Sequence, residues 1–228
     1  MTHFFQQPGF QPILISYDPL VIYLENFLSQ KEICHLRNLA EGRYYPSTVA
    51  GSNGQHVDLS TRRSSTASLP RNDSIVESVV SRAAKFQGFL PTSNFESIQA
   101  TSYVAGGEFT PHYDVVEPEP AKFHTNESQS SDGTSRATTI FAILDESCGS
   151  KCGTEFPRIK INWTNEDSRW CDYVDCDSQT LSIKPKPGNA IFWRNRRDDN
   201  SIHPDSLHAG LPLHKGTKLG INIWAEAA

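Results

Sequence analysis

The sequence predicts an α+β fold in which two helices precede a run of short strands. Apolar residues recur at helical spacing in two segments of the first 96 residues, whereas from about Ser97 they alternate as they do in strands. Turn residues separate most of the strand candidates. Helices followed by many short strands are typical of an α+β domain whose second part is a β-sandwich or jelly roll.

The first elements are a strand region and a capped helix. Residues between Pro12 and Ser29 are rich in β-branched and aromatic side chains and are interrupted at Pro19, which favours a broken strand. Ser29 and Glu32 form the pattern of a capping box, in which each side chain accepts a hydrogen bond from the other residue's backbone amide. We therefore expect a helix that begins after Ser29 and ends at Gly42.

A second helix is expected to begin at Asn72 or Asp73 and to end at Gly88. The strand candidates that follow it are residues 97–105, 110–116, 136–145, 157–163, 179–185, 189–195 and 218–225. Between the second and third of them lies the polar stretch 117–135, which is too long for a tight turn. Loops of that length are typically lids, binding loops or disordered segments.

Length and composition indicate one soluble domain. The chain has 228 residues, of which 37% are hydrophobic, and its formal net charge is −5. This acidic balance argues against binding to nucleic acid or anionic lipid through bulk charge. We find neither an apolar run long enough to span a membrane nor a secretory signal, so we expect a single cytoplasmic domain over residues 1–228. The oligomeric state is not indicated.

Four of the five cysteines lie close together in the sequence. Cys148, Cys152, Cys171 and Cys176 follow the pattern C-x3-C-x18-C-x4-C, which is near the spacing of structural zinc sites without matching it. Disulfides and ordinary reduced thiols are also compatible with such a pattern. The sequence leaves these three states open.

A histidine and an aspartate two residues apart carry the clearest chemical signal. Side chains at positions i and i+2 of a strand share a face, so His112 and Asp114 can approach one metal from one side. One further histidine would complete a 2-His-1-carboxylate triad, which suits Fe(II) because it leaves coordination positions open. His203 and His208 lie before the last predicted strand, and we favour His208 as the third ligand.

The last predicted strand presents a lysine on a face that it shares with glycine and asparagine. By alternation Leu219, Ile221 and Ile223 face one side, and Lys218 faces the other together with Gly220, Asn222 and Trp224. A lysine in that position is either a cation that awaits a carboxylate or part of a solvated surface.

These residues resemble the prolyl 4-hydroxylase-like Fe(II)/2-oxoglutarate-dependent dioxygenases, in particular the small fungal, plant and algal type. The resemblance covers roughly residues 17–224. In chain order it rests on the segments YDPL, NFLS, EICHL, RSS, ESIQATSY, the H-x-D motif, RATT, TEFP, KPGNAIFW and HAGLPL. Phe109 and Ile143 depart from the family, which often has tyrosine at both positions, and these departures put the substrate in doubt.

The resemblance implies a double-stranded β-helix, a distorted jelly roll, formed by residues 97–228, with residues 12–96 providing supporting strands and helices that pack on one sheet. His112, Asp114 and His208 would hold the iron. Lys218 would pair with the C5 carboxylate of 2-oxoglutarate, Tyr103 would line the cosubstrate pocket, and Thr139 would lie on a strand that walls it. The cofactors implied are Fe(II), 2-oxoglutarate and O2, with ascorbate as a further candidate.

Three functions remain open at this point. The first is hydroxylation of prolyl residues in a peptide or protein, with residues 117–135 closing over the substrate. The second is oxidation of a free amino acid or another small metabolite by the same centre. The third is a metal-binding module without catalytic activity, which the intact ligand set and Lys218 make the least favoured.

Overall fold

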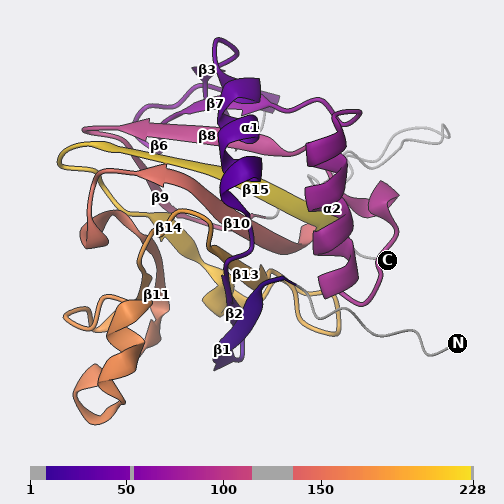
Figure 1. Cartoon of the computed structure of the whole chain (residues 1–228). Coiled ribbons are helices and arrows are strands. Elements are labelled where there is room, and N and C mark those ends of the chain that lie inside the picture. Colours follow the sequence, from indigo (N-terminus) through magenta and orange to yellow (C-terminus); the bar gives the residue numbers. More distant parts are fainter. Residues whose placement is uncertain (1–8, 52–53, 115–135, 227–228) are drawn as a thin grey trace, which may run out of the picture.

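The computed structural model describes residues 9–51, 54–114 and 136–226, and shows two β-sheets with both long helices against one of them (Figure 1). The larger sheet has the strand order β1-β2-β13-β10-β15-β8-β7-β3 and the smaller has the order β12-β11-β14-β9-β6. The predicted double-stranded β-helix with helices packed on one sheet is confirmed. The predicted loop 117–135 lies outside the described residues.

The strands of the larger sheet are β1 Gln11–Tyr17, β2 Leu20–Glu25, β3 Tyr45–Pro46, β7 Ser65–Ser68, β8 Gln99–Val104, β10 Arg136–Glu146, β13 Ala190–Arg194 and β15 Thr217–Glu226. Those of the smaller sheet are β6 Arg62–Arg63, β9 Glu108–His112, β11 Thr154–Lys160, β12 Thr180–Ile183 and β14 His208–Gly210. A separate hairpin joins β4 Val49–Gly51 to β5 Gly54–His56. The first 96 residues thus contribute strands to both sheets.

The two helices begin where their caps predict. Helix α1 (Gln30–Ala40) starts with the Ser29–Glu32 capping box, and helix α2 (Ser74–Phe86) starts at Asp73, whose carboxylate accepts the amides of Ile75 and Val76. The side chains that cap the helices also join them to each other. Asp73 lies 2.9 Å from His35 Nε2, and Glu32 accepts hydrogen bonds from Arg82 of α2. The pair of helices therefore docks as one unit.

One apolar cluster holds the helices against the larger sheet. Leu36 of α1 and Val79 of α2 are fully buried against Ile221 and Ile223, which project from β15 toward the helices. This confirms the prediction that Ile221 and Ile223 share one face of β15. The opposite face of the same strand is consequently turned toward the smaller sheet, where the polar residues lie.

Several short strands were not predicted from the sequence. Strands β3, β6, β7 and β14 span two to four residues each, too few to display an alternating pattern. The predicted strand at 157–163 begins earlier, at Thr154, and ends at Lys160. Its first residues pair with both β12 and β14, so tertiary pairing decides where this strand starts.

The outer strands of both sheets have features that hinder pairing with a strand of another molecule. In the larger sheet the outer strands β1 and β3 contain Pro12 and Pro46 respectively, and the pairing of β1 with β2 shifts register between Leu14 and Ser16. In the smaller sheet β6 has two residues, and β12 is covered by the segment between β11 and β12 through a bridge from Val174 to Ile183. This segment protrudes from the body at the lower left of Figure 1.

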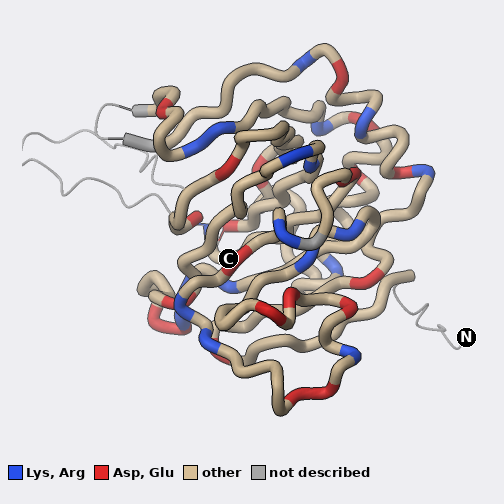
Figure 2. Tube along the Cα trace, turned by 90° about the vertical axis from the view of Figure 1, so that its left-hand side faces the viewer, with Lys and Arg blue, Asp and Glu red and all other residues tan. Residues whose placement is uncertain are grey.

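Positive and negative residues are interspersed over the trace in Figure 2, and neither sign dominates the view. None of the helices in the described ranges is long and apolar enough to cross a membrane.

Candidate active site

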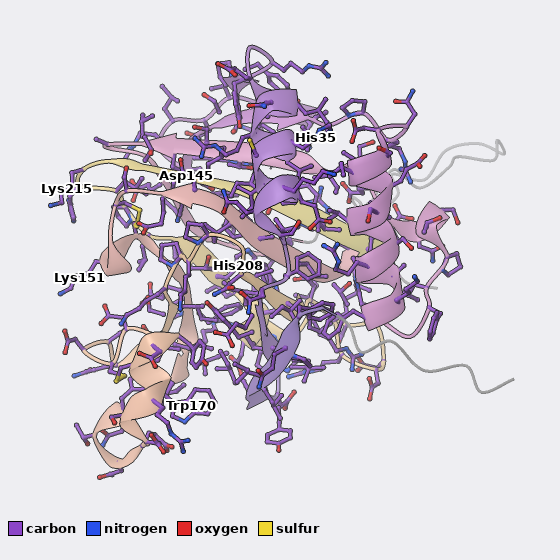
Figure 3. All side chains as sticks on the ribbon, in the orientation of Figure 1. His35, Asp145, Lys151, Trp170, His208 and Lys215 are labelled. Atoms are coloured by element: carbon purple, nitrogen blue, oxygen red, sulfur yellow. A yellow bond between two sulfur atoms is a disulfide. The ribbon has the colours of Figure 1, made fainter. Side chains whose placement is uncertain are left out.

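Three side chains meet in the cavity between the two sheets. His112 is the last residue of β9, His208 is the first of β14, and the two are register partners across these antiparallel strands. Asp114 follows β9 by two residues. One donor atom from each of the three lies within 4.8 Å of the others, as the spacing predicts. Figure 3 shows His208 in the interior of the molecule.

Backbone carbonyls fix the orientation of both imidazole rings. His112 Nδ1 lies 2.8 Å from the carbonyl oxygen of Thr110, and His208 Nδ1 lies 2.9 Å from that of Ser206. Because a carbonyl only accepts hydrogen bonds, each ring must carry its proton on Nδ1. The lone pair of each Nε2 is therefore free for a metal, and such outer contacts are usual for metal-bound histidines.

The carboxylate of Asp114 is held by one of its two oxygens. Thr139 Oγ1 donates to Oδ2 at 2.8 Å and Trp224 Nε1 donates to the same oxygen at 3.1 Å. Thr139 in turn accepts a hydrogen bond from Asn195. The other oxygen, Oδ1, faces His112 Nε2 at 3.7 Å, so it is the oxygen available to a cation.

The protonation states match a metal site. Burial is the main cause that lowers the pKa of His112 to about 3, and repulsion from His208 adds to it. Burial would raise the pKa of Asp114, but His208, His112 and Arg136 outweigh this effect and lower it to about 2. A neutral imidazole and an ionised carboxylate are the forms in which these groups bind a divalent cation.

The other histidine that the sequence raised for this role is engaged elsewhere. His203 is buried, and its Nε2 lies 2.7 Å from Asp18 Oδ1. Aromatic rings support the two histidines that do converge. Phe109 stacks on His112 with ring centroids 3.4 Å apart, and Trp193 packs on His208 at 4.6 Å. Phe109, a departure from the family pattern, thus lines the cavity in which the three side chains converge.

A buried lysine lies in the same cavity. Lys218 is 1% exposed, and its Nζ donates to the carbonyl oxygens of Cys152 at 2.5 Å and Gly153 at 3.3 Å. Tyr103, its register partner on β8, places its ring centroid 4.9 Å from Nζ. Burial lowers the pKa of Lys218 to about 7. The solvated alternative for Lys218 is therefore excluded, and among the described residues this basic group is bonded to two carbonyl oxygens and forms no ion pair with a carboxylate.

Two further polar residues that line the cavity were not predicted from the sequence. Thr154 and Arg62 both line it and are both buried, and the guanidinium of Arg62 lies over the Phe109 ring at 4.7 Å. Thr154 belongs to the TEFP segment, one of those that carry the family resemblance, so the sequence contains a signal that points to this residue. Arg62 lies in the two-residue strand β6, which has no sequence signal of its own.

Comparison with known proteins assigns the family. Residues 98–226, which contain the three converging side chains and Lys218, match the family described as the 2OG-Fe(II) oxygenase superfamily. The chain belongs to this superfamily. It is a prolyl 4-hydroxylase-like dioxygenase, an oxidoreductase, and the family implies Fe(II) and 2-oxoglutarate as its cofactors.

The curated relatives of this oxygenase include plant prolyl 4-hydroxylases. It is 34% identical over 218 residues to prolyl 4-hydroxylase 5 of Arabidopsis thaliana, covering 92% of this chain and 69% of that protein. It is 32% identical to the probable prolyl 4-hydroxylase 3 of the same plant, covering 92% and 70% respectively.

Solved structures share the fold of this oxygenase. The viral collagen prolyl hydroxylase of Paramecium Bursaria Chlorella virus-1 matches with a TM-score of 0.59 at 22% identity, covering 91% of this chain and 96% of that one. A Pseudomonas putida prolyl-4-hydroxylase matches with a TM-score of 0.54 at 13% identity, covering 97% and 94%.

Thr139 lies on β10, the strand implied to wall the cosubstrate pocket, and Phe141 of the same strand lines the cavity. The hydroxyl of Thr139 itself is bonded to Asp114, and Thr139 is absent from the described residues that line the cavity. Its register partners on the two neighbouring strands are Trp193 and Trp224. The observed contacts favour a role in orienting the carboxylate over contact with cosubstrate.

The cysteines form two separate pairs. Disulfides join Cys148 to Cys152 and Cys171 to Cys176, so a zinc site made by all four is excluded. Glu146 lies close enough to the first pair to complete a group of three metal donors, but the two sulfurs are bonded to each other. The fifth cysteine, Cys34, is free and exposed.

The hydrogen bond from Trp224 to Asp114 gives the first testable prediction. Trp224→Phe keeps most of the ring but removes the donor to Oδ2, so the carboxylate should bind metal less well. We expect a loss of about 10- to 100-fold in Fe(II) affinity, the usual cost of an outer-shell contact at a metal site. Equilibrium dialysis measures it. Trp170→Phe is the control, since Trp170 lies in the protruding segment (Figure 3), and equal affinities in the two variants would contradict the prediction.

Proposed function

We propose that this oxygenase hydroxylates prolyl residues in a peptide or protein, with His112, Asp114 and His208 as its iron ligands. The observation that supports the chemistry best is the pairing, in one cavity, of the three converging ligands with a buried, uncompensated lysine. The names of its relatives, which are prolyl 4-hydroxylases, support the substrate class.

The donor set fits iron because two neutral imidazoles and one ionised carboxylate face a common point. When bound, Fe(II) with 2-oxoglutarate and O2 supplies the oxidising power to hydroxylate a C–H bond, and succinate and CO2 are released; ascorbate would serve to keep the iron reduced. Thr139 and Trp224 hold Asp114 so that one oxygen stays available. Lys218 binds the distal carboxylate of the cosubstrate, and Tyr103 and Thr154 line its site.

Succinate release tests the proposal. The Fe(II)-loaded protein is given 2-oxoglutarate and O2 with either proline-rich peptides or free amino acids, and the peptides are analysed by mass spectrometry. We expect peptides to stimulate succinate release and to gain one oxygen atom on proline. The iron-free protein provides the background rate.

Each other outcome selects a different function. Iron-dependent succinate release that free amino acids stimulate and peptides do not would establish oxidation of a small molecule. If 2-oxoglutarate is not consumed under any condition, the chain is a metal-binding module without catalytic activity, and the proposal is wrong.

The lowered pKa of Lys218 predicts proton uptake when the cosubstrate binds. Above pH 7 the buried amine is largely neutral, and a carboxylate placed beside it favours the ammonium form. Binding of 2-oxoglutarate at pH 8 should therefore take up close to one proton, uptake should vanish near pH 6, and affinity should fall as the pH rises through 7. Calorimetry in two buffers that differ in ionisation enthalpy measures this uptake. Lys218→Met should abolish it, and unchanged uptake in that variant would assign the proton elsewhere.

The disulfides bear on where the protein works. The sequence, in which neither a secretory signal nor a membrane-spanning run is recognised, predicts the cytoplasm, where thiols are kept reduced. In contrast, the disulfides Cys148–Cys152 and Cys171–Cys176 are typical of an oxidising compartment. We propose that the protein works in an oxidising compartment. Thiol labelling of protein from its own cells, quenched with acid, should modify only Cys34 before reduction. Labelling of all five cysteines would restore the cytoplasmic prediction.

A further inference from the structure

The turn between β10 and β11 joins a disulfide to the cosubstrate cavity. Cys148 and Cys152 close this turn, and Thr154, two residues further on, lines the cavity. Cys152 is 2% exposed and packs with Tyr103 and Leu213, whereas Lys151 between the two cysteines points away from the body (Figure 3). The disulfide therefore forms part of the wall behind the cavity.

The same turn supplies the hydrogen-bond acceptors of Lys218. Its Nζ lies 2.5 Å from the carbonyl oxygen of Cys152 and 3.3 Å from that of Gly153. In the described part of the chain these two carbonyls are its only hydrogen-bond partners. They offset the cost of burying the ammonium and direct the N–H groups that face the turn, leaving at least one N–H for a ligand. The position of Cys152 thus sets the position of the cation.

Both ends of the turn are anchored. Before it, the Ser147 amide donates to the Thr217 carbonyl at 2.9 Å, which ties the turn to β15. After it, Gly153 packs so closely on β12 that an added Cβ would lie 2.1 Å from the Ile183 carbonyl oxygen. Between these anchors the backbone passes through Gly149, whose φ of +81° is left-handed. The Cys148–Cys152 bond is the covalent link that closes this span.

We propose that the Cys148–Cys152 disulfide positions Lys218 for the cosubstrate, so that reduction of this bond weakens the binding of 2-oxoglutarate. The inference rests on the proposed function of Lys218. Reduction by a trialkylphosphine breaks the S–S bond, yields two thiols and converts the phosphine and one water to the phosphine oxide. The freed turn then no longer holds the Cys152 carbonyl on the ammonium.

The second disulfide provides a matched control. Cys171 and Cys176 close a turn of similar size, and the carbonyl oxygen of Cys171 accepts a hydrogen bond from Lys184 at 2.5 Å. This turn thus repeats the combination of disulfide, carbonyl and lysine. Lys184 is absent from the described lining of the cavity, so loss of this disulfide should not affect cosubstrate binding.

The experiment compares the double variants Cys148→Ser/Cys152→Ser and Cys171→Ser/Cys176→Ser. The readouts are the dissociation constant of 2-oxoglutarate, by calorimetry on the Mn(II)-loaded protein, and the separate values of kcat and KM with iron. For the first variant we expect about a tenfold increase in the dissociation constant and KM, the effect of about one hydrogen bond to a charged group. Its kcat at saturating cosubstrate should change less than twofold, and the second variant should match the wild type.

A reduction experiment covers the case in which the first variant does not fold. The Cys171→Ser/Cys176→Ser variant retains the Cys148–Cys152 bond, so phosphine treatment of this protein, checked by circular dichroism, should reproduce the tenfold loss. Unchanged affinity after confirmed reduction, or equal losses in the two double variants, would overturn the inference. If the untreated wild type does not bind 2-oxoglutarate, the proposed function itself fails.

Discussion

Replacing Asp114 with alanine is expected to abolish substrate-dependent succinate formation, with a loss of at least about a thousandfold, or about 4 kcal/mol in the barrier. The carboxylate is the only acidic group among the three converging side chains, and Thr139 and Trp224 fix it with one oxygen facing His112. Alanine leaves two neutral imidazoles and no anion for a divalent cation. Iron affinity should fall together with turnover.

A surface carboxylate separates this effect from general damage. Asp145 is 40% exposed and pairs with Arg37 at 3.0 Å, so Asp145→Ala should keep both iron affinity and turnover within about twofold. Iron binding is measured by competition with a chromogenic chelator, and turnover by succinate release. Retained turnover in Asp114→Ala would remove this residue from the ligand set.

Replacing Lys218 with methionine should raise the KM for 2-oxoglutarate about 100-fold, equivalent to about 2.7 kcal/mol and within the cost of truncating one partner of a buried charge pair. Methionine keeps most of the volume, so the cavity stays filled, and kcat at saturating cosubstrate should be retained. Stability should rise, because burial in the free protein disfavours the ammonium form that Lys218 adopts in water, as its pKa of about 7 shows.

The same residue type outside the cavity is the control. Lys184→Met removes a lysine that also donates to a cysteine carbonyl, and it should leave the KM for 2-oxoglutarate unchanged. Thermal denaturation tests the stability part of the prediction. A Lys218→Met variant with a normal KM would place the carboxylate anchor elsewhere, and Arg62, the other buried cation of the cavity, would be the next residue to test.

The sequence predicted those parts of the site that local spacing determines. His112 and Asp114 project together because they are two residues apart, and Lys218 faces the cavity because strands alternate. The contacts of Thr139 were not predictable in this way. They depend on the pairing of β10 with β13 and β15, which brings Trp193 and Trp224 to either side of it. Register between strands distant in the chain leaves no trace in a single sequence.

The turn at 148–154 shows the same limit. Its cysteines were visible in the sequence, but their pairing and their position behind Lys218 depend on how β11 docks between β12 and β14. The fold was predicted more completely than the site because most strands are long enough to show alternation. Strands of two or three residues, such as β6 and β14, exist through tertiary pairing alone.

The protected outer strands have a consequence for the protein in concentrated solution. An exposed strand edge can pair with the edge of another copy and start aggregation. Here Pro12 and Pro46 each remove a backbone donor from an outer strand, and the bridge from Val174 covers β12. In the described ranges the oxygenase thus offers little edge for a second copy to extend. The smaller sheet, which carries His112 and His208, therefore has little exposed edge through which a second copy could pair.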